Sequence, residues 1–131
     1  KDELDYMFST DANKIQNAGF ADLSKSIYSG NHDVFGDRSV MILALPGHTP
    51  GHSALQVNLA ESGSILLTGD LYHRSESREL KRVPRFNSDE AQTRESMELF
   101  EALARESGAR VIIQHEPVDV ATLPKSPAFL Q

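Results

Sequence analysis

Three residues that can bind metal each follow an apolar, strand-like run. His48 follows the run 40–45 within the segment PGHTPGH, Asp70 follows the letters LLTG, and His115 follows VIIQ. Imidazole nitrogens bind zinc and similar borderline metals, and a carboxylate can bridge two cations. Because a sheet fixes the spacing of its strand ends while loops leave room for substrate, we expect His48, Asp70 and His115 to meet at one sheet edge.

Each of these residues also has a more ordinary interpretation when it is taken alone. An Asp after Gly is usually a turn residue, and a single His usually lies at the surface or at the edge of a core. The chain contains no cysteine, so any metal must be held by His, Asp or Glu. A metal site is therefore favoured only when the three residues are considered together with the strands that precede them. None of them indicates a metal site alone.

The strands that would position these residues can be predicted from apolar periodicity. The runs 40–45 (VMILAL), 53–59 (SALQVNL) and 65–68 (ILLT) are separated by turn residues, which predicts three strands in a largely antiparallel sheet. The run 110–114 (RVIIQ) predicts one more buried strand, with His115 at its end.

One long helix is expected between the third and fourth of these strands. Ser88 can cap it, and it should run to about Ser107 and end at Gly108. Four residues form one apolar stripe that we expect to pack on the sheet: Met97, Phe100, Leu103 and Ala104.

Less regular segments flank these elements. Residues 72–86 form a long polar connection of the kind that often carries function. The tail 116–131 contains three prolines and is expected to wrap the surface. In the opening third, the patterns at 4–8 and 21–28 each suit a short amphipathic helix.

Composition narrows the classes of partner. The net charge of −6 argues against nucleic acid, and the basic stretch 74–85 is diluted by Glu76 and Glu79. No apolar run approaches the roughly 20 residues that span a bilayer, so no membrane partner is expected. Composition leaves the compartment open, and the lack of cysteine is compatible with the cytoplasmic location that we expect.

Taken as a set, these motifs resemble the later motifs of the metallo-β-lactamase superfamily. The resemblance rests on PGHTPGH, on the downstream TGD at 68–70 and on a late histidine. It implies that His48 and His115 bind metal and that Asp70 bridges two metals. The implied cofactors are two divalent metal ions, with zinc as the expected metal.

Within that superfamily the chain is most similar to N-acyl homoserine lactonases. The segments that carry this likeness are HDVFGDRSV at 32–40, GDLYH at 69–73, VPRF at 83–86 and QHEP at 114–117. The likeness covers residues 31–131 well and the preceding residues only loosely. The implied activity is that of a metal-dependent hydrolase that opens the lactone ring of a small-molecule substrate, an acyl homoserine lactone.

The remaining histidines receive different interpretations. Many lactonases of this type have a tyrosine at the position of His73, where it polarises the lactone carbonyl; here His73 stands there with Tyr72 beside it. Either side chain could donate a hydrogen bond to developing negative charge, so both are candidate catalytic residues, and an exposed loop histidine is the competing interpretation of His73. His52 is expected either to contact the metal ligands without binding metal itself or to pack in a strand. His32 is expected to lie in a surface loop.

The superfamily's most diagnostic motif, His-x-His-x-Asp-His, does not occur in these 131 residues. We therefore expect residues 1–131 to form a single partial domain, the C-terminal part of an α/β fold. This part should have a mostly antiparallel sheet with helices on one face. The resemblance implies that two such halves stack as an αββα sandwich in the complete fold. Because the missing motif supplies ligands to both metals, we expect this chain alone to bind metal poorly and to be inactive.

Two alternatives to lactone hydrolysis stay open at this point. One keeps the superfamily and changes the substrate to a thioester or a β-lactam, which assays on substrate panels would separate. The other is a non-catalytic fragment that binds one metal weakly, or that pairs with the missing N-terminal half or as a homodimer. Metal analysis beside intact mass would separate an enzyme from such a fragment.

Overall fold

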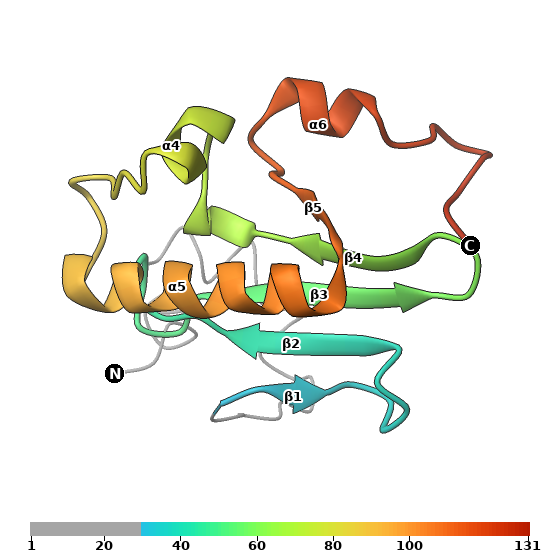
Figure 1. The fold of residues 1–131 in the computed structure, drawn as a ribbon, viewed down its shortest axis with the longest axis horizontal. Helices are drawn as coiled ribbons and strands as arrows, with labels where there is room; N and C mark the ends of the chain where they lie inside the picture. Colours follow the sequence, from blue (N-terminus) through green and yellow to red (C-terminus); the bar gives the residue numbers. More distant parts are fainter. Residues whose placement is uncertain (1–29) are drawn as a thin grey trace, which may run out of the picture.

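The computed structural model describes residues 30–131, so the helices expected at 4–8 and 21–28 lie outside the described residues. The described part contains a five-stranded sheet in the order β1-β2-β3-β4-β5 (Figure 1). Its strands are β1 (His32–Asp33), β2 (Val40–Ala44), β3 (Ser53–Leu59), β4 (Gly63–Leu67) and β5 (Arg110–Ile112). The first four strands pair antiparallel, and β5 pairs parallel with β4. The predicted α/β class with a mostly antiparallel sheet is confirmed.

Alternation along the strands directs one set of apolar side chains to each face. Leu43 of β2 pairs with Ala54 of β3, and these residues and Leu66 of β4 belong to one buried cluster. The expectation that His32 lies in a surface loop is wrong. His32 belongs to the short edge strand β1 and pairs with Ile42. This strand could not be predicted, because a strand of two residues shows no periodicity in the sequence.

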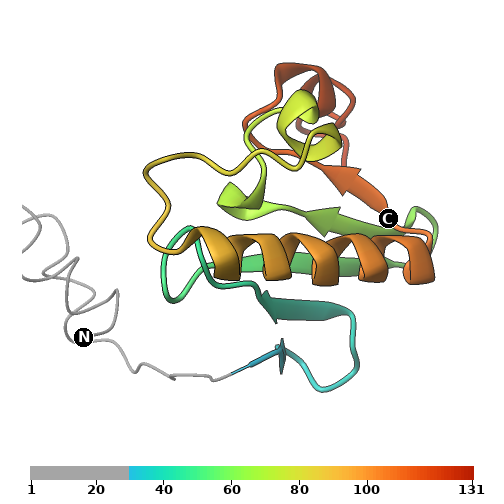
Figure 2. The ribbon, with the colours of Figure 1, turned by 60° about the vertical axis from the view of Figure 1, so that its left-hand side comes forward.

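The helix α5 (Glu90–Ser107) lies across one face of the sheet (Figure 2). Met97 and Phe100 are each 1% exposed, and Leu103 packs against the same core, which confirms the predicted stripe. The predicted cap is off by one residue: the Asp89 side chain, not that of Ser88, accepts the N–H of Gln92. Gly108 ends the helix at φ 60°, a left-handed conformation that glycine adopts without strain.

Short helices occupy the two segments that were expected to be irregular. The connection after β4 begins with a single 3-10 turn (Gly69–Leu71) and contains α4 (Ser75–Glu79). The tail contains α6 (Pro117–Ala121), which begins directly after Glu116. Within the described residues, no helix is both long and apolar enough to cross a membrane.

Candidate metal centre

Two of the predicted ligands, His48 and His115, converge on the carboxylate of the third, Asp70. The Nε2 atom of His115 lies 2.6 Å from Oδ1 of Asp70, and Nε2 of His48 lies 3.3 Å from the other oxygen, Oδ2. Asp70 is in the turn after β4, His48 in the loop between β2 and β3, and His115 three residues beyond β5. The expectation that these residues meet beyond the strand ends is confirmed.

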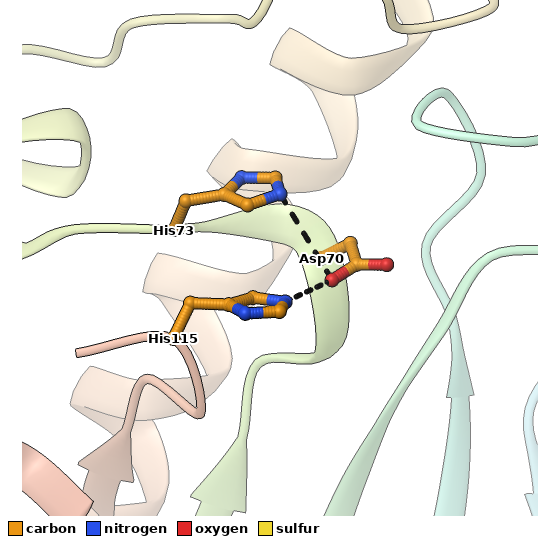
Figure 3. Close-up of side chains that lie close together, drawn as sticks. All are labelled: Asp70, His73 and His115. Carbon is orange, nitrogen blue, oxygen red and sulfur yellow. Dashed lines mark hydrogen bonds and ion pairs between the residues drawn. The ribbon is translucent and has the colours of Figure 1, made fainter. Parts of the chain in front are cut away.

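The structure adds His73 to this group. Its Nε2 lies 3.9 Å from Oδ1 of Asp70, the oxygen that also faces His115 (Figure 3). Single ligand atoms of Asp70, His73 and His115 all lie within 4.8 Å of one another. The His73 and His115 rings are stacked, with centroids 4.9 Å apart and an angle of 15° between their planes. Both imidazoles therefore present a nitrogen to the same space.

Tyr72 is not brought to this group. Its side chain is 1% exposed and belongs to the core, with its ring in edge contact with Phe100 at a centroid distance of 5.9 Å. Burial raises the pKa of the Tyr72 hydroxyl, and the negative charge of Glu101 raises it further. Of the two candidates for a hydrogen-bond donor, the structure places only His73 beside Asp70.

His52 holds the turn that carries Asp70. The backbone N–H of Asp70 donates to His52 Nε2 at 2.9 Å, and His52 Nδ1 lies 2.7 Å from the carbonyl oxygen of Leu45. Because Nε2 accepts, Nδ1 must carry the proton and donate to Leu45. His52 thus ties the end of β2 to the Asp70 turn, in agreement with the supporting role predicted for it.

The residues on either side of His115 attach its loop to the rest of the centre. Gln114 Oε1 accepts the backbone N–H of Gly69 at 2.9 Å, next to Asp70. Glu116 accepts the backbone N–H of Ser75 at 3.1 Å, at the start of α4. That backbone hydrogen bond from Ser75 is the main reason that the pKa of Glu116 is lowered. Sequence reasoning missed both contacts, because partners 45 and 41 residues apart leave no local pattern.

An aromatic side chain borders the centre on its exposed side. Phe86 is 70% exposed, and its ring makes edge contacts with His48 at 5.9 Å and with His73 at 5.8 Å between centroids. A large apolar side chain that is exposed beside reactive polar groups often marks a ligand-binding surface. Phe86 gives the centre one apolar wall.

The charges of the centre suit a divalent cation. Partial burial raises the pKa of Asp70, but the hydrogen bond from His115 and the charges of His48, His115 and His73 lower it overall. Burial lowers the pKa of His73, and the charge of neighbouring His115 lowers it further. A carboxylate beside imidazole nitrogens is a donor set for zinc and similar borderline metals. The residues present therefore fit the metal that the resemblance implies.

The curated proteins that are similar in sequence to this chain are N-acyl homoserine lactonases. The N-acyl homoserine lactonase AttM of Azorhizobium caulinodans is 31% identical over 98 residues, which are 75% of this chain and 37% of the relative. AttM of Agrobacterium fabrum is 33% identical over 98 residues, which again are 75% of this chain and 37% of the relative. No model of a protein family matches the chain.

Comparison with solved structures gives the same class of protein. An N-acyl homoserine lactone hydrolase with the product N-hexanoyl-L-homoserine bound at its catalytic metal centre aligns with a TM-score of 0.71 and 26% identity. The alignment covers 80% of this chain and 41% of that one. The chain thus spans roughly two fifths of the length of the relatives that it matches. The chain is similar in sequence to part of N-acyl homoserine lactonases and has the corresponding part of their fold, the metallo-β-lactamase fold.

Proposed function

We propose that this chain forms part of the active site of a metal-dependent hydrolase that opens the lactone ring of N-acyl homoserine lactones. The observation that carries the proposal is the convergence of His48 and His115 on opposite oxygens of Asp70. The relatives named as lactonases, and the ring-opened product in a related structure, support this choice of substrate.

In this proposal His48, Asp70 and His115 hold metal. The two oxygens of Asp70 face different histidines, an arrangement that suits a carboxylate shared between two divalent ions, with zinc as the proposed metal. Bound metal would polarise the lactone carbonyl and lower the pKa of the attacking water. The remaining ligands are proposed to come from a segment with the His-x-His-x-Asp-His motif, either in the same protein or in a pairing chain.

His73 is proposed to act on the substrate. Its Nε2 faces the space beside Asp70, where an N–H would donate a hydrogen bond to the carbonyl oxygen as negative charge develops on it. Tyr72 was the other candidate for this role, and we propose that it supports His73 by packing, because its ring is buried against Phe100.

The overall reaction adds water across the ester bond of the lactone. The water oxygen bonds to the carbonyl carbon, the ring C–O bond breaks, and the departing alkoxide takes a proton, so that an N-acyl homoserine with a free carboxylate is released. Each turnover yields a new acid group near neutral pH, and the reaction can therefore be followed by titration with base.

The proposal can be tested with this chain and with a chimera that joins the upstream part of Agrobacterium fabrum AttM to it. Both proteins would be loaded with Zn²⁺ and assayed at constant pH on acyl homoserine lactones, a thioester and a β-lactam. We expect the chimera to open lactones and the 131-residue chain alone to be far slower. A folded, metal-loaded chimera that cleaves the thioester or the β-lactam and leaves lactones intact would overturn the proposed substrate.

A further inference from the structure

A residue outside the expected ligand set contacts the ring of His48 on the side away from Asp70. Asn87 lies at the end of the connection that precedes α5, and its Oδ1 is 3.1 Å from Nδ1 of His48. The His48 side chain is 18% exposed, and Asn87 is half-buried. The contact joins residues 39 positions apart, so it belongs to the tertiary fold.

The orientation of the Asn87 amide is fixed by its other partner. Its Nδ2 donates to Oγ1 of Thr93 at 3.2 Å, and the Thr93 hydroxyl donates in turn to the backbone carbonyl of Asp89 at 2.6 Å. Thr93 is fully buried, and its single hydroxyl hydrogen is committed to Asp89. Thr93 can then only accept from Asn87, so the amide nitrogen must face Thr93 and the amide oxygen must face His48.

This orientation selects one tautomer of His48. An amide oxygen can only accept, so Nδ1 of His48 must carry the proton that lies between the two residues. The neutral ring then has its lone pair on Nε2, the nitrogen that faces Asp70 at 3.3 Å. A partner on one ring nitrogen decides in this way which nitrogen is available to a metal.

The same segment also holds the backbone of the His48 loop. The N–H of Ser88 donates to the carbonyl of His48 at 3.0 Å, and the N–H of Asp89 donates to the carbonyl of Gly47 at 2.9 Å. The ring and the main chain of His48 are therefore anchored from one place, the N-terminal end of α5.

We propose that Asn87 is a positioning residue that keeps His48 in the Nδ1–H tautomer with Nε2 directed at Asp70, and that Thr93 fixes the Asn87 amide for this purpose. The inference rests on the proposed role of His48 as a metal ligand. Its first readout, however, is the tautomer of His48 in the protein without metal, which is independent of lactone hydrolysis.

The test compares Asn87→Ala, Asn87→Asp and Thr93→Val with the unchanged chain. Asn87→Asp retains an acceptor, and Thr93→Val keeps the shape of the side chain while removing the hydroxyl. Asn58→Ala is the matched control, because it removes an amide that donates to the backbone of Arg38 in another part of the sheet. Nitrogen-15 NMR of the His48 ring in the 131-residue chain reports the tautomer, and thermal unfolding of that chain reports stability. Zn²⁺ affinity is measured by competition with a chelator in the AttM chimera that carries the same substitutions.

We expect the Nδ1–H form of His48 in the unchanged chain and in Asn87→Asp, and a mixture of tautomers in Asn87→Ala. Zn²⁺ affinity should fall about 10–100-fold in Asn87→Ala, less in Thr93→Val, and not in Asn58→Ala. An unchanged tautomer in Asn87→Ala, or a Zn²⁺ affinity within about twofold of the original, would overturn the inference. Failure of the unchanged, zinc-loaded chimera to hydrolyse lactones, alongside the expected tautomers, would count against the proposed function alone.

Discussion

At the scale of single residues, the candidate centre is a carboxylate with three imidazoles beside it, of which His48 and His115 are held by hydrogen bonds. His48, Asp70 and His115 could be predicted because each follows an apolar run within a recognisable motif. His73 could be named from the GDLYH segment as a candidate to act on substrate, but its approach to Asp70 and the contact of Asn87 with His48 could not be predicted. Their positions depend on how loops fold over one another, and a tertiary contact leaves no periodic trace in the sequence.

Gly47 is a residue whose small size the centre requires. Its φ is +131°, and an added Cβ would lie 2.4 Å from the backbone nitrogen of Thr93. Gly47→Ala should lower the free energy of unfolding by about 2–4 kcal/mol, because backbone strain adds to overpacking against α5. Gly36→Ala is the control, since Gly36 has φ +78° and open space around it, and strain alone should cost about 1–2 kcal/mol. Urea unfolding measures both, and equal losses would contradict the close packing of Gly47.

At the scale of elements, the main strands and α5 follow from the sequence because their apolar residues repeat with a clear period. The elements β1, α4 and α6 are two to five residues long, too short for a period to be evident. The cap of α5 was misplaced because Ser88 and Asp89 are both good capping residues. The structure selects Asp89, whose side chain accepts the N–H of Gln92.

The packing of α5 on the sheet leads to a prediction with an internal control. Phe100 is 1% exposed and its neighbour Leu99 is 64% exposed. Phe100→Ala should cost about 3–5 kcal/mol, the usual loss for a large side chain removed from a packed core. Leu99→Ala should cost less than about 0.5 kcal/mol. Chemical denaturation would measure both, and a loss below about 1 kcal/mol for Phe100→Ala would show that the layers are arranged differently.

A bidentate ion pair joins α4 to α5 and predicts a pH dependence of stability. Arg78 donates to the two oxygens of Glu101 at 2.7 and 2.9 Å. The hydrogen bonds from Arg78 lower the pKa of Glu101 below its ordinary value of 4.5, even though burial opposes the shift. A carboxyl whose folded pKa is lowered stabilises the protein above its unfolded pKa, and this stability is lost as the pH falls through the folded pKa.

Glu101→Gln should therefore be less stable than the unchanged chain at pH 7, by about 1–2 kcal/mol, and the difference should shrink below about pH 4.5. Glu95→Gln on the exposed face of the same helix is the control and should show little difference at either pH. Thermal unfolding across pH 3–7 provides the measurement. A difference between Glu101→Gln and the original chain that stays constant over this range would contradict the assigned ion pair.

At the scale of the whole molecule, the chain aligns with 37% of the length of its AttM relatives. It offers two histidines and one aspartate as candidate ligands, together with His73 beside them. A catalytic zinc site typically uses three protein ligands and an open position, and a centre with two metals needs more. We therefore expect the candidate ligands of this chain to be necessary for a complete metal centre, but not sufficient.

The most direct test of this claim is the zinc content of the AttM chimera after dialysis against metal-free buffer. The unchanged chimera should retain about two Zn²⁺ ions per chain, and the 131-residue chain alone should retain little. His48→Ala, Asp70→Asn and His115→Ala should each lose at least about one ion, whereas His32→Ala, changed on β1 outside the centre, should lose none. If the His48, Asp70 and His115 variants retain as much zinc as the His32 variant, these residues do not bind metal and the central claim is contradicted.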